Sequence, residues 1–233
     1  MIKFFEENSY IKEFETKIVN IDKEIKIIEL ENTAFYGKGG GQPGDSGVLV
    51  SESETIRVIE TLKKEGALLH QVNSVDNLKI GDSIKGKIDW ERRYKFMRMH
   101  TALHLVCAVV PASVTGGQIG DIKSRLDFNV DANLINKEEI QEKLNQALSN
   151  DSKISYEWVD SEFLEKKPEL IRTMSVKPPK TNGKIRLVKI GNIDLQPCGG
   201  THVKNTSEIG SITIGKIENK GKMNRRINIS LND

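Results

Sequence analysis

Residues 98–104 read Arg-Met-His-Thr-Ala-Leu-His and place two histidines four positions apart. If this segment is helical, His100 and His104 project from one face of the helix, one turn apart. Residues 198–202 read Cys-Gly-Gly-Thr-His, and the two glycines indicate a loop that folds back on itself. The side chains of His100, His104, Cys198 and His202 are together the ligand set of a tetrahedral zinc site. We therefore predict one Zn2+ ion per chain.

These motifs have other interpretations. Taken alone, each pair is more often a coincidence of surface or core residues, but the chain has only four histidines and two cysteines, and their concentration here favours a metal. A zinc-protease motif is excluded because no glutamate follows His100. Cys107 lies on the same helical stripe as the two histidines and is a rival ligand. We favour a buried apolar thiol at Cys107.

The composition is that of an ordinary globular protein. Its 233 residues leave room for two small domains, with 37% hydrophobic and 29% charged residues. The formal net charge is only +2, so any affinity for nucleic acid must come from local patches. Charged residues near the N-terminus argue against a signal peptide, and no apolar run is long enough to span a membrane. The two widely spaced cysteines indicate reduced thiols. We therefore predict a cytoplasmic protein that does not bind membranes.

The N-terminal part has the pattern of short strands. Hydrophobic and polar residues alternate, and polar turns separate the segments, which predicts a small β-barrel ending near Asp89. The expected elements are a hairpin over 15–31, strands at 48–50, 55–59 and 67–72, and a second hairpin over 79–88. His70 lies in one of these strands without a partner motif, and we interpret it as structural. A glycine-rich loop occupies residues 37–47.

The pattern changes at Trp90. The histidine helix should end at Pro111, and Asn136 should cap a second helix through a capping box with Glu139. Strands are expected at 122–130, 153–159 and 185–190, with a final hairpin over 209–231. The sequence thus predicts an α+β fold with an N-terminal small β-barrel domain at 1–89 and a zinc-containing α+β domain with an antiparallel sheet at 90–233.

The paired motifs resemble those of the alanyl-tRNA editing proteins of the AlaX type, relatives of the editing domain of alanyl-tRNA synthetase. The histidine stretch looks like the first family motif, and residues 198–203 look like the second. Residues 118–120 and 125–128 are similar to the strand segment between them. The stretch 39–47, Gly-Gly-Gly-Gln-Pro-Gly-Asp-Ser-Gly, looks like the motif of the medium-length members. The resemblance therefore implies a barrel joined to an aminoacyl-tRNA deacylase domain.

The implied reaction is hydrolysis of the ester in mischarged tRNA(Ala), carrying serine or glycine. Thr101 and Gln118 are the candidate catalytic residues beside the zinc. The candidate substrate-binding residues are Gly39, Gly40, Gly41, Gln42, Thr115, Arg125, Asp127, Asp194 and Thr201. For Thr115 an ordinary turn role is an equal alternative, and for Arg125 with Asp127 a structural pair is preferred. The partner would be tRNA, not DNA, and a monomer is slightly favoured.

Two other functions stay open. One is an RNA-binding module with structural zinc and no catalysis. The other is the same deacylation of Ser-tRNA(Thr), because threonyl-tRNA synthetases have a similar editing domain. Three positions depart from the family pattern, namely Gly37, Asp121 and Met223. Asp121 near the substrate end bears on amino-acid preference.

Overall fold

A computed structural model describes residues 1–232 except 53, 175–177, 179 and 182. The chain divides into two compact units, Met1–Lys95 and Phe96–Asp233. Helix α1 (Trp90–Val109) begins in the first unit and continues in the second.

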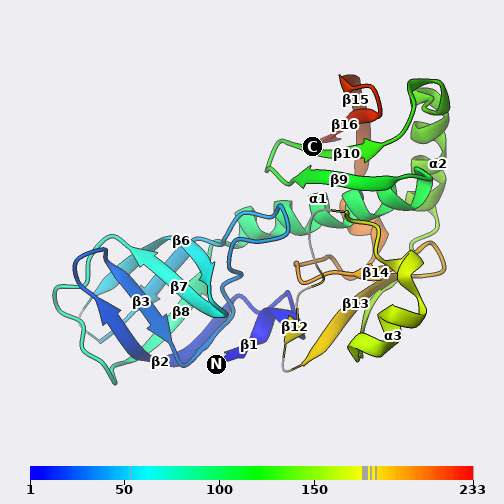
Figure 1. The fold of residues 1–233 in the computed structure, drawn as a ribbon. Helices are drawn as coiled ribbons and strands as arrows, with labels where there is room; N and C mark the ends of the chain where they lie inside the picture. Colours follow the sequence, from blue (N-terminus) through cyan, green and yellow to red (C-terminus); the bar gives the residue numbers. More distant parts are fainter. Residues whose placement is uncertain (53, 175–177, 179, 182, 233) are drawn as a thin grey trace. The chain divides into compact units, whose positions relative to one another are not determined.

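The first unit contains a closed antiparallel barrel with strand order β2-β3-β7-β6-β5-β8 (Figure 1). Its strands are β2 (Glu13–Asp22), β3 (Ile27–Leu30), β5 (Gly47–Val50), β6 (Thr55–Lys64), β7 (Ala67–Val72) and β8 (Ser83–Ile88). The short strands β1 (Ile2–Lys3) and β4 (Asn32–Thr33) form a parallel pair, and a 3-10 turn covers Phe4–Glu6. The predicted barrel is present.

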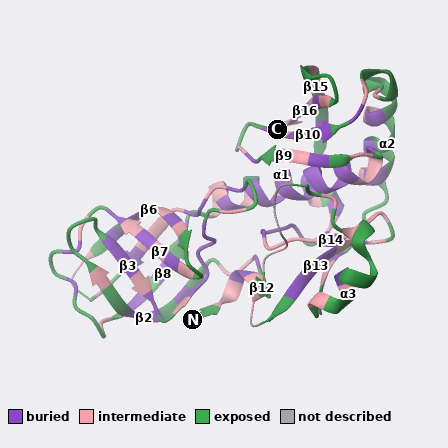
Figure 2. Ribbon diagram, in the orientation of Figure 1, coloured by how far each residue is buried: buried purple, intermediate pink, exposed green. Residues whose placement is uncertain are grey.

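The barrel interior is apolar because every second residue of its strands faces inward. Figure 2 shows buried and exposed positions alternating along these strands. Ile28, Leu30 and Leu49 are fully buried in this core. Gly86 faces the ring of Phe14, and a Cβ at this position would lie 2.4 Å from a ring atom. The glycine therefore leaves room for an aromatic ring in the core.

The hairpin expected over 79–88 is wrong. Residues 79–82 form a turn in which the backbone N–H of Lys79 donates to Asp82 and Gly81 has a φ of +95°. Only β8 is extended, and its partners are β2 and β5. The alternation of Ile80 with polar neighbours suggested a strand, but Ile80 is 65% exposed and has no strand partner.

The second unit combines two antiparallel sheets with helices, as Figure 1 shows. One sheet has the order β15-β16-β10-β9, and the other places β13 between β11 and both β12 and β14. The strands are β9 (Ser113–Gln118), β10 (Lys123–Asn129), β11 (Ile154–Val159), β12 (Lys180–Thr181), β13 (Lys184–Ile190), β14 (Asp194–Pro197), β15 (Ser211–Gly221) and β16 (Asn224–Asn232). The α+β fold class with antiparallel sheets is confirmed.

Helix α2 (Lys137–Ser149) begins as predicted, because the Asn136 side chain accepts from the backbone N–H of Glu139. Its Gln141 side chain bonds to the backbone of Ile212 and Ile214 in β15, which holds the helix against that strand. Shorter helical segments are α3 (Ser161–Lys166) and 3-10 turns at Ala132–Leu134, Pro168–Leu170 and Thr206–Ile209. None of the described helices is both long and apolar enough to cross a membrane.

Candidate metal centre

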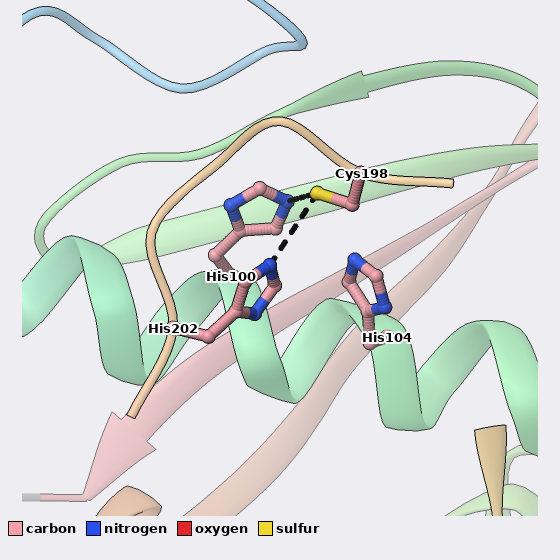
Figure 3. Close-up of side chains that lie close together, drawn as sticks. All are labelled: His100, His104, Cys198 and His202. Carbon is pink, nitrogen blue, oxygen red and sulfur yellow. Dashed lines mark hydrogen bonds between the residues drawn. The ribbon is translucent and has the colours of Figure 1, made fainter. Parts of the chain in front are cut away.

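The four predicted ligands lie together in the second unit. His100 and His104 project from one face of α1, and Cys198 and His202 come from the loop that follows β14 (Figure 3). One possible ligand atom from each residue lies within 4.8 Å of the others. The three imidazoles are buried and Cys198 is partly buried. The two motifs are separated by 94 positions, from His104 to Cys198, and the fold brings them together as the sequence predicted.

The distances fit a tetrahedral site. The Cys198 Sγ lies 3.4 Å from the Nε2 of His100 and 3.4 Å from the Nε2 of His202. Metal bonds of about 2.3 Å to sulfur and about 2.0–2.1 Å to nitrogen, at tetrahedral angles, separate these atoms by roughly 3.5 Å. A thiolate with three imidazoles is a donor set that suits zinc. The donor atoms therefore fit this ion.

Arg186 on β13 shapes the cysteine loop. Its guanidinium donates to the carbonyl oxygen of Cys198 at 3.0 Å and to that of Gly200, while the Cys198 N–H donates to the Arg186 carbonyl at 3.1 Å. The Gly200 N–H points at the Cys198 Sγ at 3.3 Å. Arg186 is buried, with its guanidinium over the ring of Tyr156. Sequence reasoning missed this residue, because one arginine in an alternating strand has no distinguishing pattern.

Two polar side chains orient the imidazoles. The Thr101 hydroxyl donates to the Met97 carbonyl, so its oxygen accepts from the Nδ1–H of His202 at 3.1 Å. The Nδ1–H of His104 donates to the Asp194 carboxylate at 2.9 Å. These contacts use the Nδ1 atoms and leave the Nε2 atoms of both histidines for the cluster, which is the arrangement that commonly supports metal ligands.

Electrostatics favour Cys198 over Cys107 as the ligand. Burial opposes the Cys198 thiolate, but the imidazoles of His100 and His202 hold the pKa of this thiol well below its usual value. Burial raises the pKa of Cys107 to about 12, so that group stays a thiol. Burial also opposes a charge on His104, but bonds to Asp194 and Cys198 raise its pKa to about 10.

The remaining candidates of the second unit form a polar network on the β9-β10-β16 sheet. The Arg125 guanidinium donates to Gln118 at 3.3 Å and to Asp127 at 2.6 Å, and Arg226 of β16 donates to both Asp127 oxygens. These bonds lower the Asp127 pKa against the opposing effect of burial. The Thr115 hydroxyl donates to the Asp127 carbonyl. Arg226 is a member that sequence reasoning did not select, although it lies in the predicted final hairpin.

Thr201 is fully buried within the cysteine loop. Gly39, Gly40, Gly41 and Gln42 belong to the first unit. There the chain turns back on itself through paired backbone bonds between Gly39 and Gln42, and Gly40 and Gly41 have φ values of +57° and +81°. Glycine is favoured at such positions because it adopts positive φ without strain.

Comparisons with known proteins agree with this arrangement. Residues 185–228 match the family described as Threonyl and Alanyl tRNA synthetase second additional domain, and residues 4–92 match tRNA synthetases class II (A). The chain is 38% identical to the alanyl-tRNA editing protein AlaX-M of Methanosarcina acetivorans, with 96% of each chain covered. It is 39% identical to AlaX-M of Saccharolobus solfataricus, with 94% of each chain covered.

A longer relative is also similar. The alanyl-tRNA editing protein AlaX-L of Pyrococcus horikoshii is 36% identical over 94% of this chain and 55% of its own length. The two AlaX-M proteins, in contrast, match over 94% or more of their own length. The structure has a barrel unit and a second α+β unit with a His3Cys cluster. Because the AlaX-M proteins also match nearly the whole of this chain, the chain belongs to the AlaX-M family of alanyl-tRNA editing proteins.

Proposed function

We propose that this protein hydrolyses the ester bond of mischarged tRNA(Ala), removing serine and glycine, with one zinc ion held by the His3Cys cluster. The buried cluster of His100, His104, Cys198 and His202 is the observation that carries the proposal. The names of the relatives support the substrate class. When bound, zinc would hold the acceptor end of the tRNA, and it would polarise the ester carbonyl if it admits the substrate beside or in place of one of its four protein ligands.

The residues around the cluster hold it ready for that task. Asp194 and Thr101 fix the rings of His104 and His202, so their contacts support positioning roles. Thr101 is fully buried, which places its hydroxyl behind the ligands. Gln118 is exposed on its strand and is held by Arg125, and we propose it as a polar contact to the aminoacyl end.

Selectivity follows from the difference between serine and alanine. A pocket that hydrogen-bonds the serine hydroxyl would leave a polar group unpaired when alanine binds, and such losses discriminate strongly. Thr115 and Gln118 are the proposed partners of that hydroxyl. The network of Arg125 and Asp127 would fix their strand positions. Gly39–Gln42 remain proposed substrate contacts of the barrel domain.

The proposed organisation follows the expected domains, a barrel at 1–89 and a deacylase domain at 90–233. We place the protein in the cytoplasm, where aminoacyl-tRNA is used, as a monomer that binds tRNA. The low pKa of the Cys198 thiol suits a reducing compartment, since a thiolate is readily oxidised.

A deacylation panel tests the proposal. Ser-tRNA(Ala) and Gly-tRNA(Ala) should be hydrolysed, and Ala-tRNA(Ala) should survive. Absence of hydrolysis with the metal bound would leave the non-catalytic RNA-binding module. Faster hydrolysis of Ser-tRNA(Thr) than of Ser-tRNA(Ala) would show that the substrate is tRNA(Thr). This alternative is tested because the family that matches residues 185–228 occurs in both threonyl- and alanyl-tRNA synthetases.

A further inference from the structure

A cavity of about 540 Å³ lies in the second unit between the start of α2 and the strands β15 and β16. Figure 1 shows α2 beside this strand pair. The cavity is lined by Ala132, Ile135, Lys137, Lys216, Ile217 and Arg225, with Asn219 at its side. We propose that it binds one nucleotide of the tRNA, with the phosphodiester on the cations and the ribose and base on the apolar floor. This inference rests on the proposed function only in taking tRNA as the partner.

The side chains that line the cavity give it a positive charge. Three of its lining residues are basic and none is acidic. In the part of the chain that the structure describes, Lys137 and Lys216 form no ion pair. Two of the carboxylates close to these lysines in the sequence have other partners, since Glu139 pairs with Lys143 and Glu218 pairs with Lys220. An anion entering the cavity therefore meets cations that are not already neutralised.

Arg225 is held in place for this task. It is 6% exposed, and its Nη1 donates to the Asn219 side chain and to the Gly221 carbonyl, while Nη2 donates to the Lys222 carbonyl. Its Nε is buried and has no hydrogen-bond partner among the described residues. Carbonyl and amide dipoles fix the guanidinium without cancelling its charge. A buried cation of this kind gains from a neighbouring phosphate.

The other features of the cavity match a nucleotide. Lys137 is the first residue of α2, whose first turn also carries Glu138 and Glu139, so the positive charge of the cavity comes from its basic side chains and not from the helix dipole. Ile135, Ile217 and Ala132 supply an apolar surface, which suits a ribose and base. The volume lies within the roughly 300–1,000 Å³ of pockets that hold small ligands. An inorganic anion alone would leave the apolar floor uncovered.

Lysine footprinting tests the site in the unmodified protein. Uncharged tRNA(Ala) should reduce acetylation of Lys137 and Lys216, measured by mass spectrometry, while Lys153 and Lys166, which are exposed in the same unit, should react as before. Equal protection of all four lysines, or of none, would overturn the proposal. If AMP protected Lys137 and Lys216 as well as tRNA(Ala) does, the proposal would also be overturned, because the cavity would then be a site for a free nucleotide.

A charge-matched pair of variants tests the contribution to affinity. Lys137→Ala/Lys216→Ala should weaken binding of uncharged tRNA(Ala) about tenfold. It should also make the slope of log K against log[salt] shallower by about 0.7 to 0.9, the contribution of one phosphate contact. Lys153→Ala/Lys166→Ala should change neither. Equal effects of the two double variants would contradict the proposal. Uncharged tRNA keeps this result independent of whether the protein deacylates.

Discussion

The ion pair between Asp45 and Arg93 gives the most quantitative prediction for the first unit. Asp45 is 1% exposed and Arg93 is 0% exposed, and the Arg93 guanidinium donates to both carboxylate oxygens. Arg93 also donates to the carbonyls of Ser9 and Ala34, and the Tyr36 N–H donates to Asp45 at 2.6 Å. Asp45→Ala would leave the guanidinium buried without a counter-charge. Breaking such a pair costs about 3–5 kcal/mol.

Hydrogen–deuterium exchange measures this cost within the barrel. The slowest amides of β6 and β7 should exchange about a hundredfold to several thousandfold faster in Asp45→Ala, which is 3–5 kcal/mol expressed as a ratio. The control is Glu13→Gln. Glu13 pairs with Lys85 and Lys87 on the surface, where solvent weakens the interaction, so its exchange should stay within about twofold of the wild type. Exchange in Asp45→Ala as slow as in the control would refute the reasoning.

Three further predictions concern titratable groups. Burial lowers the pKa of His70 to about 4. The free energy of unfolding should therefore fall by up to about 3 kcal/mol as pH falls from 6.5 to 4, because only the unfolded state binds the proton in this range. His70→Gln should make the free energy of unfolding, measured by denaturant titration, less dependent on pH. Zinc should displace the proton that His104 holds below its pKa of about 10, so the apparent zinc affinity should rise by up to about tenfold per pH unit in chelator competition. Cys198→Ala should lose zinc and deacylation while Cys107→Ala keeps both, and the reverse result in metal analysis would overturn the ligand assignment.

Local patterns predicted most of the barrel and the ends of α1 and α2. Ala67–Val72 alternates cleanly and forms β7, and α1 ends at Val109, two residues before Pro111. Asn136 caps α2 because its side chain satisfies a backbone N–H within three residues. In each case the deciding interaction is local, so the sequence contains the information.

Features that depend on tertiary partners were harder to predict. β9 reads Ser-Val-Thr-Gly-Gly-Gln, and its two glycines indicate a turn, yet pairing with β10 makes it a strand. β14 was also missed, because its four residues are extended only by pairing with β13. Asp194 was expected at the substrate, and its bond to His104 became visible only once the fold brought them together.

The cluster of His100, His104, Cys198 and His202 was predictable because rare residue types are concentrated in two motifs. The imidazole contacts of Thr101 and Asp194 and the loop contacts of Arg186 were not, since common polar residues give no signal without coordinates.

X-ray absorption at the zinc edge, on the Cys107→Ala protein, tests the central claim most directly. We expect one sulfur at about 2.3 Å and three nitrogens at about 2.0–2.1 Å around one zinc ion per chain. The sulfur is then Cys198, the other cysteine of the chain. A zinc ion without a sulfur neighbour, or a protein that binds no zinc, would contradict the account.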